Sequence, residues 1–212
     1  MKPKLKICID GIIGAGKSTL VKSLKNDYNC YEEPIEKWSL LSKFYNNMKV
    51  YSAPFQFQVL FSQYDQQNLF KTQTSKNEDI VIVERCPWTS FNIFSKMLIE
   101  DGVFDKDYIE TYEKFHNILS YEVDHFIFLK VDHKQAFKRV EARNRRAEQK
   151  LNIEYLHRLE KQYDKMLLFQ EPPNTSGSAQ RVHVVDASQT TEEIEKTVRE
   201  ILNSIIHYYR NH

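Results

Sequence analysis

The fold is decided by the stretch Gly11-Ile12-Ile13-Gly14-Ala15-Gly16-Lys17-Ser18. It matches the pattern G-x-x-x-x-G-K-[ST], in which backbone N–H groups surround a phosphate at the start of a helix. In this pattern the lysine contacts the β- and γ-phosphates, and the serine hydroxyl binds Mg²⁺. Three of the five glycines of the chain lie here, which indicates that the backbone needs unusual conformations. The motif predicts binding of a nucleoside triphosphate with Mg²⁺, and phosphoryl transfer as its chemistry.

The surroundings of this loop support that interpretation. A short apolar strand at residues 5–9 precedes the loop, and a helix with apolar residues at helical spacing follows it. The alternative, a glycine turn beside a surface lysine, does not explain this placement.

Strands alternate with helices along the whole chain. We predict strands at residues 5–9, 28–32, 79–83, 125–131 and 181–185. Helices are expected at residues 18–25, 40–47, 54–74, 90–100, 106–119, 134–146, 153–169 and 191–208, and a loop at residues 171–180. The alternation predicts a mainly parallel sheet with helices on both faces, a three-layer α/β/α fold. No domain boundary is visible, so residues 1–212 are expected to form one domain.

Composition excludes several classes of protein. Thirty Lys and Arg residues against 29 Asp and Glu residues give a net charge of +1, which argues against a nucleic-acid coat or a membrane-surface binder. The cysteines Cys8, Cys30 and Cys86 form no metal or disulfide pattern, which favours a reducing compartment. No targeting segment or membrane span is recognised, so we expect a cytoplasmic protein.

Carboxylates follow two of the predicted strands. The second strand runs into Glu32-Glu33-Pro34, and the third ends in Glu84-Arg85. Ligands of open α/β sheets bind at the carboxyl ends of the strands. A kinase needs a carboxylate that accepts a proton from a hydroxyl group, and it needs Mg²⁺ ligands. We interpret Glu33 and Glu84 as these groups; the alternatives are a solvated turn for Glu32 and a structural ion pair with Arg85 for Glu84.

Two further clusters stand out. Residues 138–150 contain six basic side chains, with Arg139, Arg143 and Arg146 on one face of the predicted helix. They predict either a solvated helix end or a lid whose guanidinium groups cover phosphates. Aromatic residues crowd residues 38–94 and alternate with glutamines, as in a slot for a flat base whose edge an amide contacts, although most of them are expected in the core.

These elements together resemble the deoxyribonucleoside kinases, which include the deoxycytidine, deoxyguanosine and mitochondrial-type thymidine kinases and viral relatives. The resemblance covers nearly the whole chain. It rests on residues 11–18, Glu33-Pro34 with Trp38, Pro54-Phe55-Gln56, Glu84-Arg85, Arg143-Asn144-Arg145-Arg146-Ala147-Glu148 and Tyr155-Leu156. It implies a five-stranded parallel sheet, the P-loop kinase fold, and a homodimer formed through a helix bundle.

The resemblance also implies roles for single residues. Glu33 is similar to the base that takes the proton from the 5′-hydroxyl, with Arg85 as its partner near the phosphates. Glu84 resembles the Mg²⁺-linked acid, and some accounts of the family give it the role of base. Catalysis is expected from Lys17, Glu33, Glu84 and Arg85, and Mg²⁺ binding from Ser18 and Glu84. ATP is expected to contact Gly11, Gly14, Ala15, Gly16, Lys17, Ser18, Thr19, the lid arginines Arg139, Arg143 and Arg145, and Ser188 and Gln189 of the adenine loop.

The nucleoside is expected in the aromatic region. The resemblance implies that Gln56 contacts the base edge, that Trp38 and Phe94 form the walls of the slot, and that Tyr45 and Glu148 hold the 3′-hydroxyl. The remaining substrate contacts are expected from Phe55, Val59, Gln63, Ser90, Glu33 and Arg85. Members that favour deoxycytidine and purines carry an arginine where this chain has Gln63 and an aspartate where it has Ser90.

The absence of this charged pair, with Val59 nearby, points to a pyrimidine, thymidine or deoxycytidine, as substrate. The sequence therefore predicts an ATP-dependent deoxynucleoside kinase of nucleotide salvage, with no nucleic-acid or membrane partner. The alternatives are a thymidylate-type monophosphate kinase, which would need an extra arginine for the acceptor phosphate, and a non-catalytic nucleotide-binding subunit with this fold.

Overall fold

The computed structural model describes residues 4–72, 79–168 and 181–211. Within these ranges five parallel strands form one sheet in the order β2-β3-β1-β4-β5. They are β1 (Leu5–Asp10), β2 (Asn29–Tyr31), β3 (Ile80–Glu84), β4 (His125–Lys130) and β5 (Arg181–Asp186). The predicted five-stranded parallel sheet is confirmed. Because β1 lies at the centre, the loop that follows it has a strand end on either side.

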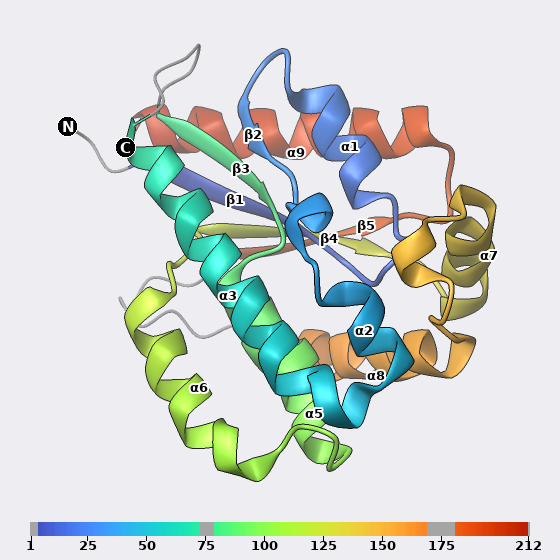
Figure 1. Ribbon diagram of the computed structural model, residues 1–212. Helices are drawn as coiled ribbons and strands as arrows, with labels where there is room; N and C mark the ends of the chain where they lie inside the picture. Colours follow the sequence, from blue (N-terminus) through green and yellow to red (C-terminus); the bar gives the residue numbers. More distant parts are fainter. Residues whose placement is uncertain (1–3, 73–78, 169–180, 212) are drawn as a thin grey trace.

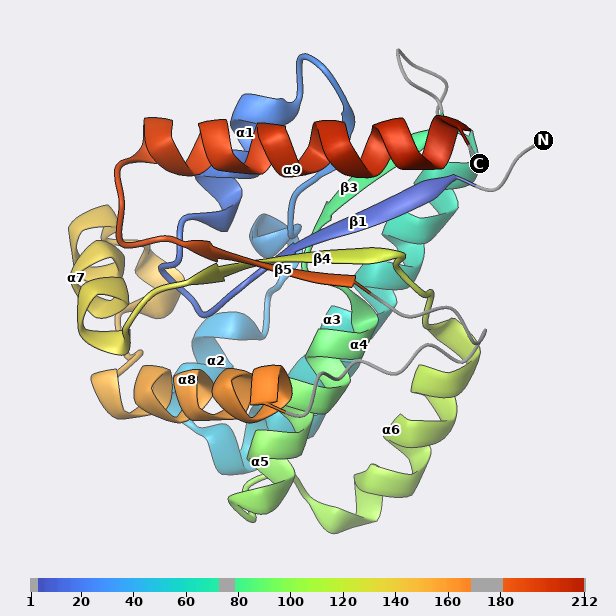
Figure 2. The same cartoon turned by 180° about the vertical axis from the view of Figure 1, so that it is seen from behind.

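Helices cover both faces of the sheet (Figure 1, Figure 2). Helices α1 and α9 lie on one face; α2, α3, α5 and α8 lie on the other, with α6 packed outside α3. The described helices are α1 (Lys17–Leu24), α2 (Leu41–Asn46), α3 (Met48–Thr72), α4 (Pro87–Thr89), α5 (Lys96–Glu100), α6 (Lys106–Leu119), α7 (His133–Arg143), α8 (Ile153–Leu168) and α9 (Thr191–Asn211). Short 3₁₀ turns η1 (Ile35–Lys37) and η3 (Arg146–Glu148) and the π-helical segment η2 (Ser90–Ser95) complete them.

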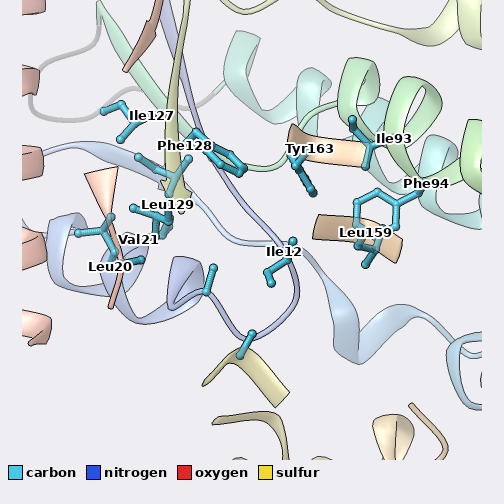
Figure 3. Close-up of a cluster of buried hydrophobic side chains, with 14 of the residues drawn as sticks. Ile12, Leu20, Val21, Ile93, Phe94, Ile127, Phe128, Leu129, Leu159 and Tyr163 are labelled. Carbon is cyan, nitrogen blue, oxygen red and sulfur yellow. The ribbon is translucent and has the colours of Figure 1, made fainter. Parts of the chain in front are cut away.

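The central strands are buried on both faces, as expected for a parallel sheet between helix layers. All five residues of β3 are buried. Figure 3 shows Leu20 of α1 beside Leu129 of β4, whereas Phe128 faces α8. The ring of Phe128 stacks on that of Tyr163, with 5.0 Å between their centroids. This packing on both sides holds the carboxyl ends of the strands in fixed positions.

Several predicted helix boundaries are wrong; α9, for example, extends to Asn211, three residues past its predicted end. Helix α3 begins at Met48 and contains Pro54, where we expected the helix to start at residue 54 because proline is tolerated best in a first turn. The helix expected at residues 90–100 begins earlier, at Pro87, and passes through the π-helical η2. Helix α7 ends at Arg143, because Asn144 adopts a left-handed conformation with φ of 45°. The loop expected at residues 171–180 lies outside the described residues.

The early end of α7 corrects one prediction about the basic cluster. Arg146 does not share a helical face with Arg139 and Arg143, because it belongs to η3, after the chain has turned at Asn144. None of the helices that the structure describes combines the length and the apolar character needed to cross a membrane.

The glycine loop is packed tightly against α7. Gly14 has a φ of +88°, and a Cβ atom there would lie 2.4 Å from the carbonyl oxygen of Ala136. Gly16 has a φ of +99° but faces open space, with no atom within 4 Å of an added Cβ. Glycine is therefore required at both positions by the backbone, and at Gly14 also by the closeness of α7.

We predict that Gly14→Ala destabilises the fold more than Gly102→Ala. Gly102 lies in a turn at a φ of +65° with no neighbour within 4 Å of an added Cβ, so alanine costs only the left-handed strain, about 1–2 kcal/mol. Alanine at position 14 adds a steric overlap with Ala136 to similar strain, so the loss should be at least about twice as large. Urea unfolding followed by circular dichroism measures both. Equal losses for the two variants would show that the loop does not depend on the contact with α7.

Candidate active site

The side chain of Lys17 is folded under the glycine loop. Its Nζ donates hydrogen bonds to the carbonyl oxygens of Gly11 and Ile12, each at 3.0 Å, and the residue is 5% exposed. Burial, reinforced by the positive charge of Arg85, lowers the pKa of Lys17 to about 8. This buried cation is placed where an anion bound by the loop would be attracted to it.

Ser18 and Glu84 meet beside the loop. The Ser18 hydroxyl donates to Oε1 of Glu84 at 2.7 Å, and the backbone N–H of Glu33 donates to Oε2 of the same carboxylate at 3.3 Å. Glu84 is 3% exposed, at the end of β3. A hydroxyl and a carboxylate oxygen are hard oxygen donors of the kind that Mg²⁺ prefers, so these two side chains fit the predicted metal.

Glu33 and Arg85 form a buried ion pair. Nη1 of Arg85 lies 2.7 Å from Oε1 of Glu33, and both side chains are less than 8% exposed. Nη2 of Arg85 donates to the carbonyl oxygen of Gly11 at 3.1 Å, and the guanidinium group lies 4.4 Å from the ring centre of Phe94. Burial raises the pKa of Glu33, and the charge of Arg85 opposes this rise. Through Arg85, which contacts both groups, a carboxylate of raised pKa is therefore held beside the glycine loop.

Asp10 holds Arg85 from the opposite side, a role that the sequence interpretation missed. Its carboxylate accepts hydrogen bonds from the Tyr163 hydroxyl at 2.7 Å, from the backbone N–H of Gly11 at 2.7 Å and from the Thr89 hydroxyl. Nε of Arg85 lies 3.7 Å from Oδ1 of Asp10. The available signal was an acidic residue at the end of a buried strand, directly before the loop.

A cavity of about 220 Å³ opens between this cluster and the aromatic residues. It brings together most of the residues predicted to contact a nucleoside: Glu33, Trp38, Tyr45, Phe55, Gln56, Val59, Arg85, Ser90, Phe94 and Glu148. Glu84, predicted as the Mg²⁺-linked acid, lines it as well. Residues that line it without having been predicted are Ile13, Lys22, Ile35, Leu41, Phe44 and Tyr155. Tyr155 belongs to the Tyr-Leu element quoted above, which was the one available signal for it.

Gln63 lies behind the cavity wall instead of in it. Its Nε2 donates to the Ser90 hydroxyl at 2.9 Å, and Ser90 lines the cavity. Its Oε1 is buried and has no hydrogen-bond partner among the described residues. Gln63 is therefore connected to the cavity only through its hydrogen bond to Ser90 among the contacts of the described residues.

The π-helical segment η2 positions Gln56. The hydroxyl of Ser95, the last residue of η2, contacts the Ser90 carbonyl oxygen at 3.0 Å and Oε1 of Gln56 at 3.3 Å. Gln56 is 2% exposed and lines the cavity. The irregular turn thus orients an amide at the cavity wall, in agreement with the frequent use of π segments at functional sites.

Two arginines, one at the end of α7 and one just after it, share one carboxylate. Arg143 donates to Oε2 of Glu148 at 2.6 Å, and Arg145 donates to Oε1 at 3.0 Å. The arginine side chains are each 32% exposed, whereas that of Glu148 is 5% exposed. Arg139 donates to the carbonyl oxygen of Ala187 at 2.9 Å instead. Arg143, Arg145 and Glu148 all line the first cavity.

A second cavity, of about 260 Å³, lies on the other side of the loop. Predicted nucleotide contacts that line it are Gly14, Ala15, Gly16, Thr19, Arg139, Arg143 and Gln189. Ser188 and Gly11 line neither cavity: the Ser188 carbonyl accepts from Gln135 at 3.3 Å, and the Gly11 carbonyl accepts from Lys17 and Arg85. Because Gly14, Gly16, Thr19 and Arg143 line both cavities, the two adjoin at the loop.

The chain matches the family model "Deoxynucleoside kinase" over residues 7–207. It is 50% identical over 201 residues to protein 143R, a protein of Invertebrate iridescent virus 6 that is named as a kinase. The match covers 94% of this chain and 97% of the relative. It is 30% identical to the thymidine kinase of Ictalurid herpesvirus 1, covering 93% and 86%. The deoxyadenosine kinase from M. mycoides is similar in structure, with a TM-score of 0.79, 27% identity and coverage of 94% and 100%, and has dCMP and a flexible dCDP bound. A second structure of that enzyme has dATP bound.

We predict that nucleotide affinity depends on the charge of Lys17. In the free protein this charge is lost as the pH rises through about 8, so the Kd for Mg-ATP should rise by up to ~10-fold between pH 7 and 9. Lys17→Ala should bind weakly and without this dependence. Fluorescence titration at several pH values measures both. An unchanged affinity of the unsubstituted protein across this range would contradict the assignment of Lys17.

Proposed function

The chain belongs to the deoxynucleoside kinase family, and we propose that it transfers the γ-phosphate of ATP to the 5′-hydroxyl of a deoxyribonucleoside, a pyrimidine above all. One observation carries this proposal: Glu33 and Arg85 lie between an aromatic cavity and a phosphate-binding loop. A nucleoside in the first cavity would present its 5′-hydroxyl to Glu33. A triphosphate held by the loop would present its γ-phosphate to the same point.

Glu33 acts as the general base in this mechanism. A 5′-hydroxyl is a weak nucleophile, and a carboxylate within about 2.6–3.2 Å accepts its proton as the phosphoryl group arrives. Burial raises the pKa of Glu33, which strengthens it as a proton acceptor. Arg85 fixes the orientation of this carboxylate through Nη1 and keeps it from being an isolated buried charge.

Glu84 suits a different task. Both of its oxygens already accept hydrogen bonds, one from Ser18 and one from the backbone of Glu33. We therefore propose that Ser18 and Glu84 hold Mg²⁺, either directly or through water. Bound Mg²⁺ would neutralise charge on the β- and γ-phosphate oxygens.

Cationic side chains stabilise the charge that develops on the transferred group. Lys17 reaches the β- and γ-phosphates from below the loop. We propose that residues 139–150 form a lid and that Arg143 and Arg145 exchange contacts with Glu148 for contacts with phosphate. Arg143 lines both cavities, which supports this role, and Arg139 lines the nucleotide side. Gln189, and Ser188 beside it, are proposed to belong to the loop that runs alongside the adenine ring of ATP.

Neutral groups define the base end of the cavity. Gln56 is proposed to contact the base edge between Trp38 and Phe94, and Tyr45 and Glu148 to hold the 3′-hydroxyl. Gln63 and Ser90 form an uncharged hydrogen-bonded pair, 2.9 Å apart, in place of a charged pair. This supports a pyrimidine such as thymidine or deoxycytidine as the preferred substrate, whereas the named relatives divide between thymidine and deoxyadenosine kinases.

The organisation of the protein is part of the proposal. We propose one domain and a homodimer formed through α3 and α6. The rings of Phe61 on α3 and Phe115 on α6 lie 5.9 Å apart and are 45% and 39% exposed, which supports an apolar interface there. The three cysteines are unpaired, in keeping with the cytoplasm as the proposed compartment.

We predict that Glu33→Gln lowers kcat by ~10²–10⁴ with little change in the binding of either substrate. Glutamine keeps the shape and the contact with Arg85 but removes the basic oxygen. Steady-state kinetics and nucleoside titrations measure the two effects separately. The matched control is Glu32→Gln: Glu32 neighbours Glu33 but pairs with the exposed Lys22 and Lys25 at the surface, so this variant should retain full turnover.

Glu84→Gln distinguishes the two acids. It should weaken the binding of Mg²⁺, so that a higher Mg²⁺ concentration is needed for half-maximal rate and added Mg²⁺ restores part of the activity. If Glu33→Gln stays active and Glu84→Gln loses kcat at every Mg²⁺ concentration, Glu84 is the base. If all three variants stay active, the mechanism is wrong.

A further inference from the structure

Three potential metal ligands meet between α7 and α8, outside both cavities. They are His133, the first residue of α7, and His157 and Glu160, one turn apart on α8. One ligand atom from each lies within 4.8 Å of the other two. His133 is at least 24 residues away in the sequence from the two ligands on α8, so it is the packing of the two helices that brings all three together.

The two imidazole rings converge on one carboxylate oxygen. Nδ1 of His133 lies 2.6 Å from Oε2 of Glu160, and Nδ1 of His157 lies 3.5 Å from the same atom. The ring centroids are 4.3 Å apart. Nδ1 of His157 is buried and has no hydrogen-bond partner among the described residues. An unpartnered buried nitrogen beside a carboxylate oxygen is an arrangement that a cation would complete.

The donor set and its spacing fit a borderline transition-metal ion. In a tetrahedral zinc site with bonds of about 2.0–2.2 Å, the ligand atoms lie about 3.3 Å apart. The observed separations of 2.6 Å, 3.5 Å and at most 4.8 Å bracket this value, so side-chain rotations suffice. Two imidazoles and a carboxylate leave a fourth position, and side-chain exposures of 19%, 36% and 23% let water reach it.

We propose that His133, His157 and Glu160 bind one Zn²⁺ ion, or a similar divalent transition metal, with water as the fourth ligand. The ion ties α7 to α8. Helix α7 carries Arg139 and ends at Arg143, and α8 carries Tyr155 of the nucleoside cavity. Because His133 begins α7 and Arg143 ends it, the metal anchors one end of the helix and leaves the arginine end free to move.

The test uses the full chain, stripped of metal and then titrated with Co²⁺ as a spectroscopic probe. We expect one Co²⁺ per chain, the visible absorption bands of a tetrahedral site, and loss of these bands on addition of Zn²⁺. Zn²⁺ should also raise the Tm of the unsubstituted protein. His133→Gln, His157→Gln and Glu160→Gln should each weaken Co²⁺ binding at least ~10-fold and abolish the rise in Tm.

The matched control is His183→Gln. His183 lies on β5 and contacts His125 on β4, with the ring nitrogens 3.3 Å apart. The substitution therefore removes one imidazole from a different pair of histidines. The variant should bind Co²⁺ like the unsubstituted protein. The metal-free Tm and the kinase activity of every variant show whether its fold is intact.

Three results would overturn the proposal. The first is an unsubstituted protein that neither binds Co²⁺ in a tetrahedral site nor gains stability from Zn²⁺. The second is undiminished binding in the His133, His157 and Glu160 variants. The third is loss of binding in His183→Gln alone, which would place the metal at the His125–His183 pair.

Discussion

Arg85 is a buried cation that contacts groups at the ends of two strands, β1 and β2, which lie on either side of its own strand β3. Its guanidinium group lies against Glu33 after β2, Asp10 at the end of β1, and the Gly11 carbonyl oxygen. Arg85 itself follows β3 with a left-handed φ of 61°, a conformation that costs a non-glycine residue about 1–3 kcal/mol. A buried charge is tolerated only when it is paired, and removing one partner typically costs about 3–5 kcal/mol. The site therefore depends on this guanidinium group being neutralised from both sides at once.

The two cavities follow from that constraint. Lys17, Glu33 and Arg85 line the first cavity, and Gly14 and Gly16 of the glycine loop line both, so neither cavity is independent of the other. Lys17 and Glu33 are both shifted by burial, the amine to a lower pKa and the carboxyl to a higher one. Each group thus gains from a ligand of complementary charge or from a proton, and the arrangement suits transfer of an anionic group from one cavity to the other.

Sequence reasoning worked where the chemistry is local. The loop at residues 11–18 specifies its own strand, turn and helix, and the acids Glu33 and Glu84 follow predicted strands whose ends must meet at one edge of a parallel sheet. Aromatic residues near Gln56 were recognisable as a potential slot, but propensity could not say which of them line it, and Phe44 and Tyr155 were missed.

The remaining features depend on tertiary packing. The left-handed Asn144 ends α7 early and separates Arg146 from Arg143, although helix propensity continues through the segment. The π turn at Ser90–Ser95 leaves no mark in the hydrophobic pattern, yet it orients Gln56. Asp10 reads as the last residue of a strand, and only the fold reveals that Tyr163, Thr89 and Arg85 converge on it.

The central claim is tested most directly by identifying the product. The protein is incubated with ATP, Mg²⁺ and each of the four deoxynucleosides, and separately with thymidine 5′-monophosphate, and the products are analysed by mass spectrometry and ³¹P NMR. The account predicts new 5′-monophosphates, formed fastest from thymidine or deoxycytidine, and no diphosphate from the monophosphate. Formation of the diphosphate without turnover of any nucleoside would contradict it, as would phosphate transfer to none of the five acceptors.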